Sequence, residues 1–203
     1  AFRRDADEVV IKAIELSTMF TDDAGSVIAG VIGASSVEAA AFGQSGRDFV
    51  TGVAEAVLGA TESLGRELSG LGRLEQVEQE LHDATEHVGV VAAGEVERIV
   101  DGVDRDPIKT AIAGLLLAAP MLDMPHRAIE EAARLGGSGL GAFVGAVVGA
   151  RVGIRAWPWP FANDTWFAEI GRRVVRGPDE VRDLPIPYAV EQHLISGSAR
   201  GYH

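Results

Sequence analysis

The sequence predicts an all-α domain. Apolar residues recur at three- and four-residue spacing through most of the 203-residue chain, which is the period of a helix with one buried face. No segment shows the steady alternation of apolar and polar residues, bounded by turns, that a half-buried strand requires. No internal repeat has the period of a solenoid. We therefore expect a compact multi-helix bundle over residues 1–180 and a polar, proline-containing tail over residues 181–203.

Three helices are expected near the N-terminus. Asp7–Met19 places its apolar residues roughly on one stripe, and Thr21–Asp23 is typical of a turn and an N-cap. Ala24–Phe42 consists of small and aliphatic residues, which can pack closely on several sides, so we expect this helix at the centre. Gly43–Gly46 predicts a break, and Arg47–Leu64 predicts the third helix.

The middle of the chain predicts an exposed helix and a buried one. Leu71–His87 is strongly charged and carries its apolar residues on one face, as an amphipathic surface helix does. Val88–Gly94 is expected to be a loop or the start of a short helix, and Glu95–Val103 a further short helix. Asp106-Pro107 predicts a helix start with Asp as the N-cap. Ile108–Leu122 is apolar nearly all round, which indicates a buried helix.

Three helices are expected from Pro125 onward. The helix that opens at Pro125 is predicted to end near Leu135–Gly137, and a small-residue helix to run from about Leu140 to Gly153. Trp157–Pro160 is expected to be extended, because proline disfavours helix in the residue before it. Asp164–Arg176 is the last clear helical pattern.

Composition excludes several classes of function. The net charge of −12 argues against a nucleic-acid partner, which needs clustered Lys and Arg. The absence of Cys removes disulfides, thiolate metal sites and cysteine nucleophiles. The uncharged stretch between Arg134 and Arg151 is shorter than the roughly 17–25 residues of a membrane span, so we expect no membrane contact and a cytoplasmic location. No signal peptide opens the chain, and without an initiator Met it fits a fragment of something longer.

Glycines recur every four residues near the end of the helical region, at positions 137, 141, 145, 149 and 153. On a helix this spacing builds a stripe with almost no side chains, against which another backbone can pack closely. We expect tight packing inside the bundle; a membrane dimer face is the alternative.

The segment from Gly136 to Ala142 is the candidate ligand loop. Gly137–Ala142 fits a dinucleotide-binding pattern, but that pattern needs a preceding strand, and a helix is expected before it. The segment is then either a glycine-rich turn at a helix N-terminus, which can accept an anion, or a plain turn between helices.

Acidic and histidine clusters are weaker candidates for metal binding. His82, Asp83, Glu86 and His87 have the four-residue spacing of helical metal ligands, but their charged surroundings favour surface ion pairs. The acidic groups near turns favour helix capping over metal ligation; they are Asp22, Asp23, Asp101, Asp104 and Asp106.

Four stretches, read in order, resemble the ADP-ribosylglycohydrolase family, chiefly its C-terminal two-thirds. They are Ala13–Asp23 with the helix that follows to Gly43, the loop at Gly89 leading into Glu95-Val96, Ala128–Gly137, and Gly141–Gly153 followed by Pro160 and Trp166. Together they cover most of residues 9–176. The resemblance implies an all-α orthogonal bundle. It also implies hydrolysis of an N- or O-glycosidic bond to ADP-ribose, assisted by two Mg²⁺ or Mn²⁺ ions.

The chain departs from the family where metal ligands are expected. In the family the Gly-Gly pair is followed by Asp-x-Asp-Thr or Asp-x-Asp-Ser, and here those positions are Ser138, Gly139, Leu140 and Gly141. Thr21–Asp23 has the letters of the family's N-terminal ligand motif, but it lies at a later turn where the family has Ser/Thr-His. Ligation is therefore not transferred to it.

We therefore expect a family-like domain without metal-dependent hydrolysis, with no catalytic residue, no metal ligand and no cofactor, acting as a binding or regulatory module. The expected ligand is ADP-ribose or a related nucleotide, held near Gly89, Gly136, Gly137, Ser138 and Gly139. One alternative is an active hydrolase, using Mg²⁺ or Mn²⁺, whose remaining ligands come from a preceding segment or a partner chain. The other is an unrelated helical module that binds a protein partner.

Overall fold

The computed structural model describes residues 6–64, 74–91, 103, 105–153, 168–169 and 172–173. These residues contain helices and turns and no strand, which confirms the all-α prediction. The helices are α1 (Ala6–Thr18), α2 (Ala24–Ala41), α3 (Gly46–Leu64), α4 (Leu74–Val91), α5 (Pro107–Ala118), the short 3-10 helix η2 (Ala119–Met121) and α6 (Pro125–Val152).

Contacts divide the chain into two compact units, Ala1–Trp157 and Pro158–His203. All the helices above belong to the first unit. The predicted domain boundary after residue 180, the extended segment 157–160 and the tail 181–203 lie outside the described residues. So do most of the helices predicted at 95–103 and 164–176.

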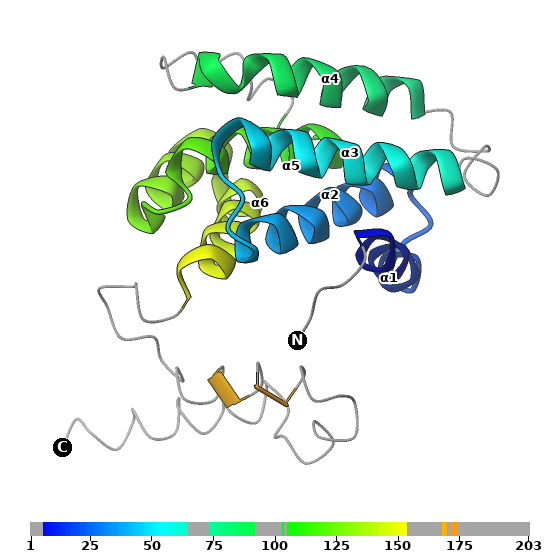
Figure 1. Cartoon of the computed structure of the whole chain (residues 1–203), viewed down its shortest axis with the longest axis horizontal. Helices are drawn as coiled ribbons and strands as arrows, with labels where there is room; N and C mark the ends of the chain where they lie inside the picture. The colour runs from blue at the N-terminus through cyan, green and yellow to red at the C-terminus, as the bar shows by residue number, and fades with distance from the viewer. Residues whose placement is uncertain are drawn as a thin grey trace. The chain divides into compact units, whose positions relative to one another are not determined.

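Helix α2 lies at the centre of the first unit, where it contacts α1, α3, α5 and α6 (Figure 1). It begins where predicted, because the Asp23 carboxylate accepts hydrogen bonds from the Ser26 N–H and hydroxyl, both at 2.8 Å. Gly30 lets α1 approach closely, since a Cβ there would collide with the Ser17 hydroxyl. Small residues therefore place α2 in the core, as predicted.

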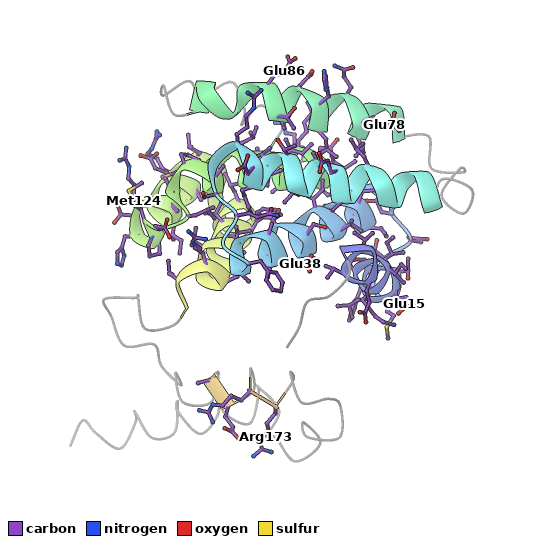
Figure 2. The ribbon with its side chains drawn as sticks, in the orientation of Figure 1. Glu15, Glu38, Glu78, Glu86, Met124 and Arg173 are labelled. Atoms are coloured by element: carbon purple, nitrogen blue, oxygen red, sulfur yellow. The ribbon has the colours of Figure 1, made fainter. Side chains whose placement is uncertain are left out.

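Helix α4 is a surface helix packed on α3 through one apolar face. Val77, Leu81 and Ala84 are buried at helical spacing, and Figure 2 shows Glu86 on the side of α4 that faces away from α3. The helix continues to Val91, so residues 88–91 form neither the loop nor the start of a new helix that was predicted there, and residues 92–94 lie outside the described residues. A single glycine inside a helix costs only about 0.5–1 kcal/mol, and the valines around Gly89 continue the helical pattern.

Helix α5 is buried on nearly every side, as predicted. The Asp106 carboxylate caps it by accepting a 2.9 Å hydrogen bond from the Ile108 N–H, and Pro107 occupies its first turn. The chain tightens into η2 at Ala119, and Pro120 explains this change, because proline lacks the N–H that would continue the helix.

Helix α6 is bent at Gly136 and Gly137 into two segments. Gly137 has φ 64° and ψ −149°, a conformation that residues with a Cβ rarely adopt. A Cβ at Gly136 would lie 2.6 Å from the Val103 side chain and 2.8 Å from that of Leu140. The break predicted here is confirmed. The helix resumes at Ser138, so the gap predicted up to Leu140 is wrong: the two glycines turn the chain without a loop.

The bend brings the two segments of α6 together. Ile129, in the first segment, lies 3.6 Å from where a Cβ at Gly145 would be. An ion pair of 2.9 Å between the Asp123 carboxylate and the Arg151 guanidinium joins the approach to α6 to its last turn. Inside this arrangement lies a small apolar cluster, which consists of Ala113, Leu117, Met121, Ala128, Ala132, Leu140, Val144 and Val148.

The predicted tight packing of the glycine stripe is wrong for most of its length. In the part of the chain that the structure describes, no heavy atom lies within 4 Å of a Cβ added at Gly141, Gly149 or Gly153. Gly145 does have a neighbour, the side chain of Ile129. The second segment of α6 instead buries Leu140, Val144, Val147 and Val148.

Among the described helices, α2 and α6 are long and apolar enough to cross a membrane by length and composition alone. In α2, 56% of the apolar window is buried within the protein, and in α6, 28%. This is weak evidence for a membrane span, because the core helix of a globular bundle passes the same test.

Candidate functional site

A cavity of about 400 Å³ lies between α2, the start of α5 and the second segment of α6. Its volume is within the range of roughly 300–1,000 Å³ that small-molecule sites occupy. It is lined by Ala29, Arg105, Pro107, Thr110, Ala111, Gly139 and Phe143. Most of this lining is apolar, and Arg105 supplies the one charged side chain among these lining residues.

Phe143 forms an aromatic wall of the cavity, and it lies between two glycines, one of which makes room for it. A Cβ at Gly114 in α5 would come within 3.0 Å of the ring, and a Cβ at Gly33 in α2 would lie 3.4 Å from it. The ring therefore occupies a slot between α2 and α5. A side chain at Gly114 would collide with the ring, whereas a Cβ at Gly33 would be in ordinary contact with it. Its orientation is set before any ligand arrives.

The rim of the cavity carries a positive charge. Arg105 is exposed and forms no ion pair within the described residues. The carboxylate of the adjacent Asp106 is engaged in capping α5 through Ile108. The Thr110 hydroxyl donates a 3.0 Å hydrogen bond to the Asp106 carbonyl. The guanidinium thus remains available to an anion.

The structure brings one of the predicted ligand residues to this cavity. Gly139 lines it, whereas Gly136 is buried at the bend and Gly137 and Ser138 are exposed outside the lining. Gly89 lies inside α4 and away from the lining.

Sequence reasoning missed the residues that shape the cavity most. The sequence predicted the start of α5 at Asp106-Pro107, but the adjacent Arg105 was not predicted to bind a ligand. Phe143, a single aromatic residue among glycines, alanines and valines, was a signal that the helix faces something unusual there.

The residues that the structure describes do not fit the family's two-metal centre. Of the positions where the resemblance expects carboxylates, Ser138 is exposed, and Leu140 is fully buried at 0% exposure in the apolar cluster of α5 and α6. Across the described ranges, no group of three or more His, Asp or Glu side chains is placed to hold a metal ion.

The acidic residues predicted as caps or surface pairs have those roles in part. Asp22 is exposed and is not the cap of α2, which is Asp23. Asp23 and Asp106 cap helices. His82 and Glu86 approach to 3.8 Å on the exposed face of α4, with side-chain exposures of 68% and 65%. The Asp83 carboxylate accepts a hydrogen bond of 2.8 Å from Gln79. The side chain of His87 and both Asp101 and Asp104 lie outside the described residues.

One exposed apolar surface stands apart from the cavity, at the C-terminal end of α1. Leu16, Met19 and Phe20 are 58%, 77% and 82% exposed. On the opposite face of α1, Val10 is buried. A helical module that binds a protein partner would need such a surface. The alternative that this chain is such a module stays a prediction.

Comparison with known proteins identifies one family. The family model described as ADP-ribosylglycohydrolase matches residues 1–184. No curated protein and no solved structure matches the chain. The matched range contains every described residue, including the bend of α6 and all seven residues of the cavity lining.

Proposed function

The chain belongs to the ADP-ribosylglycohydrolase family, and we propose that it is a domain of this family that binds its ligand without metal-dependent hydrolysis. The observation that carries this proposal is the burial of Leu140. This residue occupies a position where the family resemblance expects a metal-binding Asp, and it is fully enclosed by apolar side chains.

The surroundings of Leu140 are unsuited to a ligand for a hard cation. Mg²⁺ and Mn²⁺ take oxygen ligands, and a two-metal site needs several carboxylates that converge on a polar space. Leu140 instead packs in a cluster with Leu117, Val144 and Val148. An unpaired carboxylate among these side chains would be strongly disfavoured.

The cavity beside the bend is the binding site that we propose. It contains Gly139, the position where the predicted ligand loop and the cavity lining coincide. It also offers an aromatic wall at Phe143 and a cation at Arg105, which are groups that a nucleotide can use. Because the chain belongs to this family, ADP-ribose or a related nucleotide is the first ligand to test.

Thermal melting of the purified chain tests the proposal. Melting curves are recorded with and without ADP-ribose, each in Mg²⁺, Mn²⁺ or chelator. A ligand that binds only the folded state adds about 2.7 kcal/mol at one hundred times its dissociation constant. We expect ADP-ribose to raise the melting temperature equally in all three conditions, with no release of ADP-ribose from a modified protein. A metal-dependent shift, or metal-dependent release, would contradict the proposal.

A matched pair of variants locates the bound ligand. Gly139→Gln adds a side chain at the wall of the cavity, whereas Gly141→Gln adds the same side chain where no atom lies within 4 Å of the Cβ. We expect the first variant to lose the ADP-ribose shift and the second to keep it. Equal behaviour of the two variants would place the ligand elsewhere.

A further inference from the structure

We propose that the cavity between α2, α5 and α6 selects a ligand with a flat ring that carries one anionic group, the ring lying against Phe143 and the anion at Arg105. This inference rests on the proposed function, a domain that binds rather than hydrolyses, and it names the chemical class that the site takes. Neither the family match nor the predicted ligand loop assigns a role to Phe143 or Arg105.

The ring is recognised by a wall that is fixed in advance. Phe143 is held between Gly33 and Gly114, where no side chain competes for its place. The neighbouring lining residues Ala29 and Ala111 have side chains too short to cover the ring. A flat ring can therefore stack on or against Phe143 without first ordering a flexible side chain, which is a main cost of binding.

The anion is recognised by a single exposed cation. Arg105 forms no ion pair within the described residues, and its guanidinium presents donors in the fork that carboxylate and phosphate oxygens match. The chain as a whole carries a net charge of −12, so anions are repelled at long range. Recognition must then come from this local contact, and one cation suits one anionic group.

The probes for the test are phenyl phosphate, benzyl alcohol and inorganic phosphate. Phenyl phosphate carries both the ring and the anion, and the other two carry one feature each. Titrations of the ¹⁵N-labelled full chain, followed by amide chemical shifts, measure each dissociation constant. We expect phenyl phosphate to shift the amides of Thr110 and Gly139, with an affinity at least tenfold above that of either single-feature probe. Equal affinity of phenyl phosphate and one single-feature probe overturns the proposal.

Two variants with a control separate the ring contact from the ion contact. We expect Arg105→Gln to lower the affinity for phenyl phosphate at least tenfold and to leave the affinity for benzyl alcohol unchanged. Lys109→Gln removes a nearby cation of α5 that does not line the cavity, so its affinity for phenyl phosphate should match that of the unaltered chain. Phe143→Leu should lower the affinity for both ring-bearing probes. The amide spectrum of this variant reports whether it folds.

The outcomes keep this inference apart from the proposed function. If ADP-ribose stabilises the Arg105→Gln and Phe143→Leu variants as much as the unaltered chain, metal-independent binding stands and the ligand class proposed here is wrong. If ADP-ribose binding depends on a metal, the proposed function fails, and the phenyl phosphate titration still decides whether the cavity selects ring-bearing anions.

Discussion

Glycine has opposite roles in two regions of the bundle. At Gly114 and Gly136 it makes room for a neighbouring side chain, because an added Cβ would collide with that side chain. At Gly141 and Gly149 an added Cβ meets no atom within 4 Å in the described structure. The first group determines packing and the shape of the cavity, whereas the second only lowers helix propensity. The spacing of glycines in a sequence therefore does not reveal which of them are required.

The largest effect is expected at Leu140, whose side chain packs directly over Gly136. Leu140→Asp would put a carboxylate in an apolar cluster and lower the free energy of unfolding by about 3–5 kcal/mol, the cost of an uncompensated buried charge. Urea unfolding measures this change. Leu140→Asn, which is similar in shape but uncharged, is the control.

The same variant tests the proposed function. Leu140→Asp puts back one carboxylate that the family resemblance expects at this position, and we expect Mn²⁺ to give no recovery of its stability. Recovery by Mn²⁺, without the same effect on Leu140→Asn, would mean that a metal centre can form beside the bend.

Gly114→Ala is expected to cost about 1–3 kcal/mol, the usual penalty for overpacking a core, because the new methyl group collides with the Phe143 ring. The double variant Gly114→Ala with Phe143→Ala should lose less stability than the sum of the two single losses, because the ring that meets the new methyl group is gone. Thermal melting of the single and double variants forms the test. A double variant that loses the sum of both single effects would show that the collision is not the cause.

At the bend, Gly137→Ala is expected to lower the free energy of unfolding by about 1–3 kcal/mol, the range for a backbone conformation that side chains resist. Gly137 is exposed and has φ 64°, so the loss would come from the backbone alone. Chemical unfolding checks it. An unchanged stability would mean that the bend relaxes at little cost.

The smallest effect, and the one of opposite sign, is expected in the open stripe. Gly141→Ala and Gly149→Ala should each raise the free energy of unfolding by about 0.5–1 kcal/mol, because alanine is the better helix former and the space around each Cβ is open. Thermal melting of both single variants checks this. Destabilisation by either one would show that a partner surface packs against the stripe.

Local chemistry made much of the fold predictable from the sequence. Asp23 and Asp106 marked two helix starts, because a carboxylate at an N-cap satisfies free N–H groups. The apolar helix at α5 and the small-residue helix at α2 were placed correctly in the core. The error at Gly89 arose from treating one glycine as a helix end, although its cost is small beside that of a buried helix face.

The site was less predictable, because it is made by residues from three separate elements. Nothing near Phe143 in the sequence indicates that Gly33 and Gly114 flank its ring, since that pairing exists only after α2, α5 and α6 have packed. The position of Arg105 at a cavity could likewise not be predicted, because most of the other residues that line the cavity are distant from it in sequence. The glycine turn was found because its signal is local.

The bend of α6 also bears on the order in which the chain folds. Asp123 and Arg151, 28 positions apart, are joined by a hydrogen bond of 2.9 Å, and Ile129 lies over Gly145. The two segments of α6 thus find part of their packing within one short stretch of the chain, as an antiparallel hairpin of helices does. Contacts that are close in sequence form quickly, because little loop entropy is lost before they are made. We therefore expect this stretch to gain protection from amide exchange early during refolding, before the contacts of α2 with distant helices are complete.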